Sequence, residues 1–571
     1  MRAFWLLAFA PLLAAQRGAV EVSSRTSYPE VWPAGPAQSS VPAWAAPGKI
    51  RFARWDGGRL ETAKAMLSGW PGFNPPVPDL VDTMTNWYSP RTLDLLQQAG
   101  INTIWVTFSV GFSNPTERGN QEQLRNYIAE CHRRGIHVLA YESIANLFWE
   151  DMFEKVPESK NWVRVDAQGK PTPYGAGAYQ KVGRITRYMA RLDEPAWRAY
   201  LRQRVDLALD AGADGIFYDN NLHEGLFETY REIYQHGSRR KADMLLAGNF
   251  HADSYVLNRI TNALSTEDGM EPGIYASDNL KGRAGRSRAS LLLVEGGYLV
   301  NNLGLYRIYQ SLTGGWKPAF IEDGSRETGD RFTRPIPAAR HQIALAEGMM
   351  FGIAMQIFSE GAFANGLMRA DPEAMEIWRA IGRYNQFFAS NEALYAPGKS
   401  MARVAIVLDD RSDGCDLLNA LAARNLLFDV LYDVEVTAAR LAPYAAVVAA
   451  SGNYRPQART ALENYQGKLM RSLDAPHIEE IAAALKVFPP QVELDAPAGV
   501  VYNPVSQSGR VVIHLLNYSP QAKDGITLRV PSGYRAATLL SPDETRESAT
   551  LKGSKVTIPR LKTYSVLVLS R

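Results

Sequence analysis

The 571-residue sequence contains little cysteine and almost no net charge. Cys131 and Cys415 are the only two cysteines, and we expect them in different domains, which argues against a disulfide framework. The formal net charge is +3, from 62 basic and 59 acidic residues, so charge gives no support for a nucleic-acid partner. Beyond the N-terminal segment, no apolar run is long enough to span a membrane.

Several motifs of well-known enzyme classes are absent from the sequence as well. It contains no HExxH helix, no cluster of cysteine and histidine, no phosphate-binding Walker loop and no Gly-x-Ser-x-Gly elbow. The eight histidines are scattered, and only His223 and His251 follow predicted strands. Without clustered imidazole or thiolate ligands, the sequence gives little evidence for a metal site. We therefore predict no metal and no other cofactor.

The N-terminal segment has the composition of a secretory signal. A basic start is followed by the apolar run 3–13 and by small residues at 14–15. This run is too short to span a membrane, and we expect cleavage near Ala15 or Gln16. We therefore predict a secreted or periplasmic protein, in which residues 16–48 form a proline-rich leader.

From Lys49 onward, short apolar segments alternate with helical patterns. Eight such strand and helix units over about 340 residues predict an α/β fold, a (β/α)8 TIM barrel at 49–395. The predicted strands are 50–55, 102–109, 136–141, 215–218, 244–247, 263–266, 318–321 and 353–358. An irregular insertion at 157–188 and a helical region at 291–312 complete the predicted barrel.

Two further domains are predicted after Pro397. Apolar strands alternate with helices at 400–490, which indicates a small doubly wound, flavodoxin-like α/β domain. Short alternating runs predict an antiparallel β-sandwich at 496–571. We expect structural or assembly roles for both, because neither carries a convincing catalytic group.

The fourth predicted strand carries the most suggestive residues. Residues 215–218 favour a buried strand, which runs directly into Asp219 and two asparagines. An aspartate at the carboxyl end of a barrel strand lies where this fold places its chemistry. The alternative is that Asp219 caps the following helix, since Asp and Asn are good N-caps.

The other strand ends favour chemistry, because they also carry carboxylates. The residues concerned are Asp56, Glu142, Asp219, Glu267, Asp268, Glu271, Glu322, Asp323 and Glu360. In a barrel all eight carboxyl ends face one mouth, so these groups are expected to converge. Nearby aromatic side chains (Tyr141, Tyr218, Trp149 and Trp316) suit the faces of a sugar ring. Glycoside hydrolysis needs two carboxyl groups, about 5–5.5 Å apart for retention and about 6.5–9.5 Å for inversion of configuration.

Two resemblances to glycoside hydrolases follow from these residues. Phe217-Tyr218-Asp219-Asn220 resembles the nucleophile strand of retaining α-galactosidase-type barrels, which implies an acid/base on strand six, here Glu267 or Asp268. The order of barrel, small α/β domain and C-terminal sandwich resembles the trimer-forming β-galactosidases, and residues 511–518 (VVIHLLNY) are similar to a closing sandwich strand of those enzymes. The second resemblance implies glutamates at strands four and seven. Glu322 fits, whereas strand four ends in aspartate.

We therefore predict an exported, retaining glycoside hydrolase with Asp219 as nucleophile. Glu267 is the preferred acid/base, and Asp268, Glu271 and Glu322 are the competing candidates. The residues predicted to bind substrate are Tyr141, Glu142, Tyr218, Asn220, Asn249, His251 and Glu271. The expected partner is a carbohydrate, and the second resemblance implies a homotrimer. The alternatives are a non-catalytic carbohydrate-binding barrel and a scaffold that assembles through its middle domain.

Overall fold

The computed structural model divides the chain into two compact units. The first unit comprises Met1–Pro42, Trp55–Pro90 and Ile104–Ser265, and the second comprises Ala43–Arg54, Arg91–Thr103 and Thr266–Arg571. The structure describes residues 35–57, 79–174, 181–182, 185–221, 225–249, 258–276, 292–323, 335–409, 415–450, 454–471, 478–543 and 548–571.

Eight parallel strands form one nearly closed barrel sheet, in the order β8-β7-β3-β2-β1-β14-β13-β9. The strands are β1 (Phe52–Arg54), β2 (Thr103–Ser109), β3 (His137–Ser143), β7 (Gly215–Asp219), β8 (Leu245–Gly248), β9 (Leu264–Gly269), β13 (Ala319–Asp323) and β14 (Ala354–Phe358). A parallel bridge between Asn249 and Ser265 links the two outer strands of this order. The predicted TIM barrel with additional domains is therefore confirmed.

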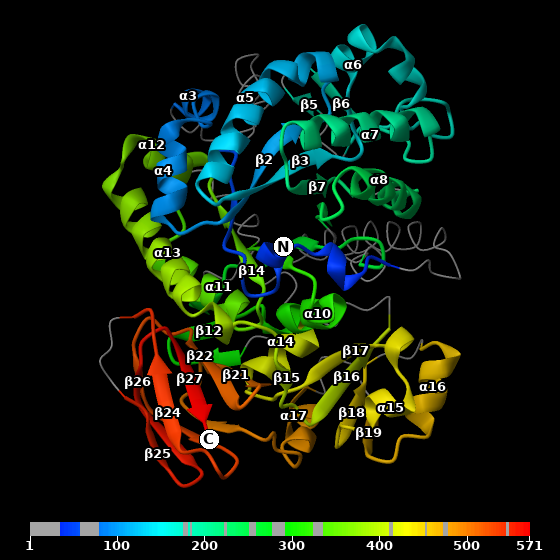
Figure 1. Ribbon diagram of the computed structural model, residues 1–571. Helices are drawn as coiled ribbons and strands as arrows, with labels where there is room; N and C mark the ends of the chain where they lie inside the picture. The colour runs from blue at the N-terminus through cyan, green and yellow to red at the C-terminus, as the bar shows by residue number, and fades with distance from the viewer. Residues whose placement is uncertain are drawn as a thin grey trace, which may run out of the picture. The chain divides into compact units, whose positions relative to one another are not determined.

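In the first unit, the barrel strands are covered by amphipathic helices (Figure 1). These helices are α5 (Asn114–Arg133), α7 (Pro195–Asp210) and α8 (Leu226–Arg240), and the short helix α3 (Leu80–Thr85) precedes them in the chain. Helix α7 begins where Glu194 accepts a hydrogen bond from the Ala196 amide and Pro195 occupies the first turn. Its buried residues Trp197, Leu201 and Val205 recur every four positions, which places one apolar face against the sheet.

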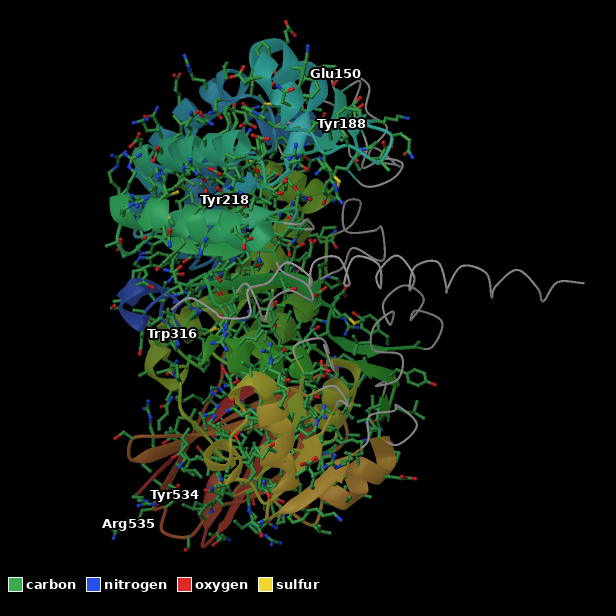
Figure 2. The ribbon with its side chains drawn as sticks, turned by 90° about the vertical axis from the view of Figure 1, so that its right-hand side faces the viewer. Glu150, Tyr188, Tyr218, Trp316, Tyr534 and Arg535 are labelled. Atoms are coloured by element: carbon green, nitrogen blue, oxygen red, sulfur yellow. The ribbon has the colours of Figure 1, made fainter. Side chains whose placement is uncertain are left out.

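The predicted irregular insertion after β3 contains regular structure. Strands β4 (Asn146–Phe148), β6 (Ile185–Met189) and β5 (Lys181–Val182) form a small antiparallel sheet, accompanied by α6 (Trp149–Lys155). We call residues 144–190 the β3 insertion. Figure 2 shows Glu150 and Tyr188 together at this end of the first unit. Glu150 accepts the Thr186 amide at 2.8 Å, which ties α6 to the sheet.

The second unit contains the barrel helices α4 (Pro90–Gln98), α10 (Leu303–Thr313), α11 (Ala338–Met349), α12 (Gly361–Arg369) and α13 (Pro372–Ser390). The predicted helical region at 291–312 is confirmed only for its second half, where α10 begins at Leu303. Before α10 begins, strand β12 (Gly297–Val300) pairs with β11 (Leu292–Val294) on one side and with β10 (Gly273–Tyr275) on the other. Gly296 and Gly297 both have positive φ, and this turn conformation interrupts any helix there.

A four-stranded parallel sheet follows the barrel, in the order β17-β16-β18-β19. Its strands are β16 (Val404–Leu408), β17 (Asp429–Tyr432), β18 (Ala446–Ala449) and β19 (Lys468–Arg471). The accompanying helices are α14 (Cys415–Ala423), α15 (Ala438–Leu441), α16 (Pro456–Glu463) and α17 (Ile478–Leu485). The two central strands, β16 and β18, are apolar and buried because helices pack on the sheet.

Two antiparallel sheets complete the chain. One has the order β15-β21-β22-β27-β24: β15 (Lys399–Ser400), β21 (Val500–Gln507), β22 (Arg510–Asn517), β27 (Tyr564–Ser570) and β24 (Ala536–Leu540). The other has the order β20-β23-β26-β25: β20 (Glu493–Asp495), β23 (Lys523–Arg529), β26 (Lys555–Leu561) and β25 (Thr550–Lys552). Alternate residues of both sheets, such as Ile513 and Ile558, share one apolar core. No helix among the described residues is long and apolar enough to cross a membrane.

Candidate functional site

An aromatic layer fills the interior of the barrel strands in the first unit. Trp105 of β2 stacks on Tyr141 of β3 with ring centroids 4.5 Å apart, and on Phe217 of β7 at 5.7 Å. All three side chains are buried. Since side chains alternate along a strand, Asp219 lies on the same face as Phe217, two residues nearer the carboxyl end. The aspartate therefore sits directly above the aromatic layer.

Neutral donors hold the carboxyl group of Asp219, which is 8% exposed. The Tyr141 hydroxyl donates to Oδ2 at 2.6 Å, and the Asn249 side-chain amide donates to Oδ1 at 3.0 Å. The backbone amide of Asn220 also donates to Oδ1, at 2.7 Å. Three donors directed at two oxygens suit an ionised carboxylate, which only accepts hydrogen bonds.

Asn220 turns the chain sharply after the aspartate. Its φ is +67°, a left-handed conformation that asparagine tolerates better than most residues. Its side-chain oxygen accepts the Ser143 hydroxyl at 2.6 Å and the Asn146 amide at 2.8 Å, and its amide donates to the Tyr174 hydroxyl at 2.9 Å. With these partners Asn220 connects β7 to β3 and to the β3 insertion.

The alternative role of Asp219 as a helix cap is not what the structure shows. Helix α8 begins at Leu226, and its N-cap position is occupied by Gly225. The Asp219 side chain instead accepts the backbone amide of the next residue and two side chains from neighbouring strands. Its geometry is therefore that of a rim group of the barrel.

Glu142 and Tyr218 lie on the opposite face of their strands from Tyr141 and Asp219. Glu142 is fully buried, and neither of its oxygens has hydrogen-bond geometry with a described residue. Burial raises its pKa to about 8, although the nearby Arg204 guanidinium and Tyr218 hydroxyl lower it. At neutral pH this group is mostly protonated. The substrate-binding role predicted for Glu142 and Tyr218 has no support from this placement.

The second unit repeats the pattern of an aromatic residue followed two positions later by a charge. Phe52 of β1 stacks on Phe320 of β13 at 4.6 Å, and Arg54 and Glu322 follow them. Arg54 is 4% exposed; its guanidinium lies 2.5 Å from Glu360 Oε1 and 3.6 Å from Glu322 Oε2. One guanidinium thus serves two buried carboxylates.

The predicted acid/base residues Glu267 and Asp268 lie in β9, where both are only partly buried. Glu271 follows the strand and serves as a structural acceptor. The Tyr275 hydroxyl donates to its Oε1 at 2.9 Å, and the Arg340 Nε lies 3.8 Å from the same oxygen. Its carboxyl is thus engaged within the second unit.

Some predicted residues lie outside the described part of the chain: His223, His251 and the side chains of Trp149 and Asp323. The expectation for Trp316 was wrong. Trp316 precedes β13 (Ala319–Asp323), so it lies at the amino end of that strand, opposite the end that bears Glu322.

Among the described residues, no group of three His, Cys, Asp or Glu side chains has an arrangement that could hold a metal ion.

Sequence reasoning missed Arg54, although a pattern could have found it. Phe52-x-Arg54, Phe217-x-Asp219 and Phe320-x-Glu322 each place an aromatic residue in the barrel interior and a charge one layer above. Period-two alternation near a strand end therefore marks the inward-facing charges more reliably than the first polar residue after the strand.

Comparison with solved structures gives the fold independent support. The chain is similar to α-L-fucosidase isoenzyme 2 from Paenibacillus thiaminolyticus (TM-score 0.61, 12% identity, covering 91% of this chain and 99% of that one). It is also similar to the cold-adapted β-galactosidase from Rahnella sp. R3 (TM-score 0.60, 12% identity, covering 95% and 100%). The β-galactosidase from Bacillus circulans sp. alkalophilus gives a TM-score of 0.53 at 11% identity, covering 84% and 96%. No family model and no curated protein sequence matches the chain.

Proposed function

We propose that this chain is a glycoside hydrolase that uses Asp219 as a nucleophile. The observation that carries the proposal is the Asp219 carboxylate, held by three donors at the carboxyl end of a TIM-barrel strand. The similar fucosidase and β-galactosidase structures share this architecture. Because fold alone does not imply function, the proposal depends on the chemistry of the aspartate.

The proposed reaction has two steps with retention of configuration. Asp219 Oδ attacks the anomeric carbon while a protonated carboxyl group gives its proton to the leaving oxygen, so that the glycosidic bond breaks as the glycosyl ester forms. The deprotonated acid then takes a proton from water, which attacks the same carbon and releases Asp219. Tyr141 and Asn249 keep the nucleophile oriented through the hydrogen bonds that they donate.

Glu267 of β9 is the proposed general acid and base, with Asp268 next to it as the competitor. Glu322 is a weaker candidate, because its carboxyl group already contacts the Arg54 guanidinium, 3.6 Å from Oε2. Glu271 is weaker still, since Tyr275 already donates to its carboxyl. These assignments of β9 and β13 carboxylates to the reaction are proposals from strand position.

The proposal is tested by hydrolysis of chromogenic α- and β-glycosides, beginning with galactosides and fucosides. Wild type is expected to release the chromophore from one anomer, and Asp219→Asn to release almost none. The variant of the true acid should lose activity most on substrates with poor leaving groups, and Glu267→Gln is expected to do so while Asp268→Asn is not. Full activity of Asp219→Asn would overturn the proposal. If no glycoside reacts but a sugar binds in calorimetry, the chain is a carbohydrate-binding barrel instead.

Three further proposals concern the whole protein. We infer export through the N-terminal signal, which N-terminal sequencing of the secreted form would test. We read the parallel sheet β17-β16-β18-β19 as a flavodoxin-like domain and the two antiparallel sheets as a sandwich. Assembly into a trimer is expected from the resemblance to β-galactosidases, and light scattering of the purified protein would decide it.

A further inference from the structure

Residues 270–275, the segment that follows β9, are held by the side chain of Asn302. It forms the pair of backbone hydrogen bonds that a neighbouring strand would form. The Met270 amide donates to Asn302 Oδ1 at 2.7 Å, and Asn302 Nδ2 donates to the Met270 carbonyl at 2.7 Å. Asn302 is the residue before helix α10, so its own backbone is fixed by that helix. Both backbone groups of Met270 are thereby satisfied two residues after Asp268.

Glu347 of α11 orients this asparagine. The backbone amide of Asn302 donates to Glu347 Oε1 at 2.8 Å, and its Nδ2 donates to Oε2 at 2.9 Å. Since Nδ2 has two hydrogens, it serves the Met270 carbonyl and Glu347 together, and Oδ1 must face the Met270 amide. Glu347 is fully buried, and burial raises its pKa to about 7 while its hydrogen-bond donors lower it. A buried carboxyl group with this many hydrogen-bond partners fixes one orientation of the Asn302 side chain.

Arg340, seven residues earlier on the same helix, holds the far end of the segment. Its guanidinium donates to the Pro272 carbonyl at 3.2 Å and to the Ile274 carbonyl at 3.0 Å, and it packs 4.2 Å from the centre of the Tyr275 ring. A spacing of seven residues is about two helical turns, so Arg340 and Glu347 lie on one face of α11. Helix α11 thus contacts the segment directly through Arg340 and indirectly through Asn302.

Both the backbone conformation and this contact favour glycine at position 273. Its φ is +146°, and a Cβ there would lie 1.2 Å from an Arg340 guanidinium nitrogen. Any larger residue would have to displace the arginine. Helix α11 therefore holds the segment near Met270, through Asn302, and near Ile274, through Arg340.

The C-terminal sheet reaches the same carboxylate. Tyr518, directly after β22, donates its hydroxyl to Glu347 Oε1, and its backbone amide donates to the Gly499 carbonyl at 3.0 Å. Tyr518 is fully buried. A continuous set of hydrogen bonds thus runs from the C-terminal sheet through Glu347 and Asn302 to Met270, all within the second unit.

The geometry points to Glu347, Arg340 and Tyr518 as positioning residues, which fix the segment after β9 and so the direction of the Glu267 and Asp268 carboxyl groups. The part of this inference that concerns catalysis rests on the proposed function. The part that concerns the segment itself does not. It assigns to the C-terminal sheet a role in shaping the barrel loop next to the proposed acid.

The experiment combines hydrogen exchange with kinetics on the full-length protein. Tyr518→Phe and Glu347→Gln should speed exchange of the Met270 amide about tenfold or more, because each removes a partner from the hydrogen-bonded set. The matched control is Tyr384→Phe. Tyr384 also donates to a buried carboxylate of the C-terminal part, Asp543, at 2.9 Å, but not to this network. The control is expected to leave Met270 exchange unchanged.

Kinetics separate positioning from general loss of stability. In Tyr518→Phe we expect kcat to fall about tenfold with KM nearly unchanged, and in Tyr384→Phe we expect both constants to stay at wild-type values. Unchanged Met270 exchange in both Tyr518→Phe and Glu347→Gln overturns the inference, whatever the activity. If exchange rises while activity falls equally in the control, the catalytic part is wrong. Full activity of Glu267→Gln and Asp268→Asn together would refute the acid assignment of the proposed function instead.

Discussion

The carboxyl ends of β7 and β13 have the same residue pattern, but their carboxylates contact different groups. Each strand places a phenylalanine in the barrel interior and a carboxylate two residues later, Phe217 then Asp219 and Phe320 then Glu322. Asp219 accepts hydrogen bonds from neutral groups, namely a phenol, a side-chain amide and a backbone amide. Glu322 instead lies beside the guanidinium of Arg54.

We propose that this difference separates a nucleophilic carboxylate from a structural one. In the proposed reaction, the hydrogen bonds from Tyr141 and Asn249 orient the Asp219 carboxylate for attack on the anomeric carbon. A guanidinium shared by Glu322 and Glu360 cancels much of their charge and stiffens the strand ends. Two strand ends with the same residue pattern can therefore have different roles, and the groups that contact the carboxylate determine which role it has.

The largest expected effect is that of Asp219→Asn. The amide cannot form the glycosyl ester, so we expect kcat to fall about 10⁴-fold or more. Because Asn is nearly isosteric and keeps an acceptor for Tyr141, the thermal midpoint should stay close to that of the wild type. Glu322→Gln is the matched control from the other strand end and should lose far less activity. An equal loss in both variants would contradict the distinction between the two strand ends.

Arg54→Met is expected to have the next largest effect, and on stability. It leaves Glu322 and Glu360 buried without their shared cation, which should cost about 3–5 kcal/mol of unfolding free energy. Urea denaturation followed by circular dichroism measures this loss. Arg54→Met combined with Glu360→Gln should recover part of it, since one uncompensated charge is then removed. No recovery in the double variant would show that the ion pair is not the cause.

Glu142→Gln is expected to change how stability depends on pH. The folded pKa of Glu142, about 8, lies above its ordinary value of 4.5, so the native state binds the proton more tightly than the unfolded chain. Its contribution is fully present below pH 4.5 and is lost as pH rises towards 8, by up to about 1.4 kcal/mol per pH unit. Wild type should therefore lose stability over this window more steeply than Glu142→Gln, measured by urea midpoints at pH 5 and 8. Equal pH dependence in the two proteins would rule the prediction out.

The smallest of these effects is expected for Tyr141→Phe. The ring that stacks on Trp105 is kept, and only the hydroxyl that donates to Asp219 is lost. We expect kcat/KM to fall about 10–100-fold, the equivalent of one hydrogen bond to a charged group. Tyr230→Phe, which removes a hydroxyl that donates to Asn221 at 2.8 Å, is the control and should change it less. A larger loss of kcat/KM in Tyr230→Phe than in Tyr141→Phe would show that the Tyr141 hydroxyl is not the group that orients Asp219.

The barrel could be predicted because its signals are local. Each of the eight predicted strands overlaps an observed one, since apolar segments between helical patterns mark buried parallel strands. The strands at 292–300 were missed because β11 and β12, which pair with each other, have only three and four residues, and the other partner of β12, β10, ends as early as Tyr275. Pairing at such a distance leaves little trace in a local pattern.

The candidate site was predicted less completely, for a definite reason. We placed the end of the third strand at Tyr141, so Glu142 was read as the first residue of a loop at the mouth. The strand continues to Ser143, and alternation therefore turns Glu142 towards Arg204 and the helices. One or two residues at a strand end decide which face a side chain occupies, and hydrophobic patterning does not fix that boundary.

The most direct test of the account is to capture the glycosyl ester. Wild type would be incubated with an activated 2-fluoro analogue of the glycoside that it hydrolyses, and the protein then digested and analysed by mass spectrometry. The account predicts one added glycosyl group, located on Asp219 and absent from Asp219→Asn. A glycosyl group on Glu267, Asp268 or Glu322 would contradict it, as would active enzyme that never forms an adduct and releases product with inverted configuration.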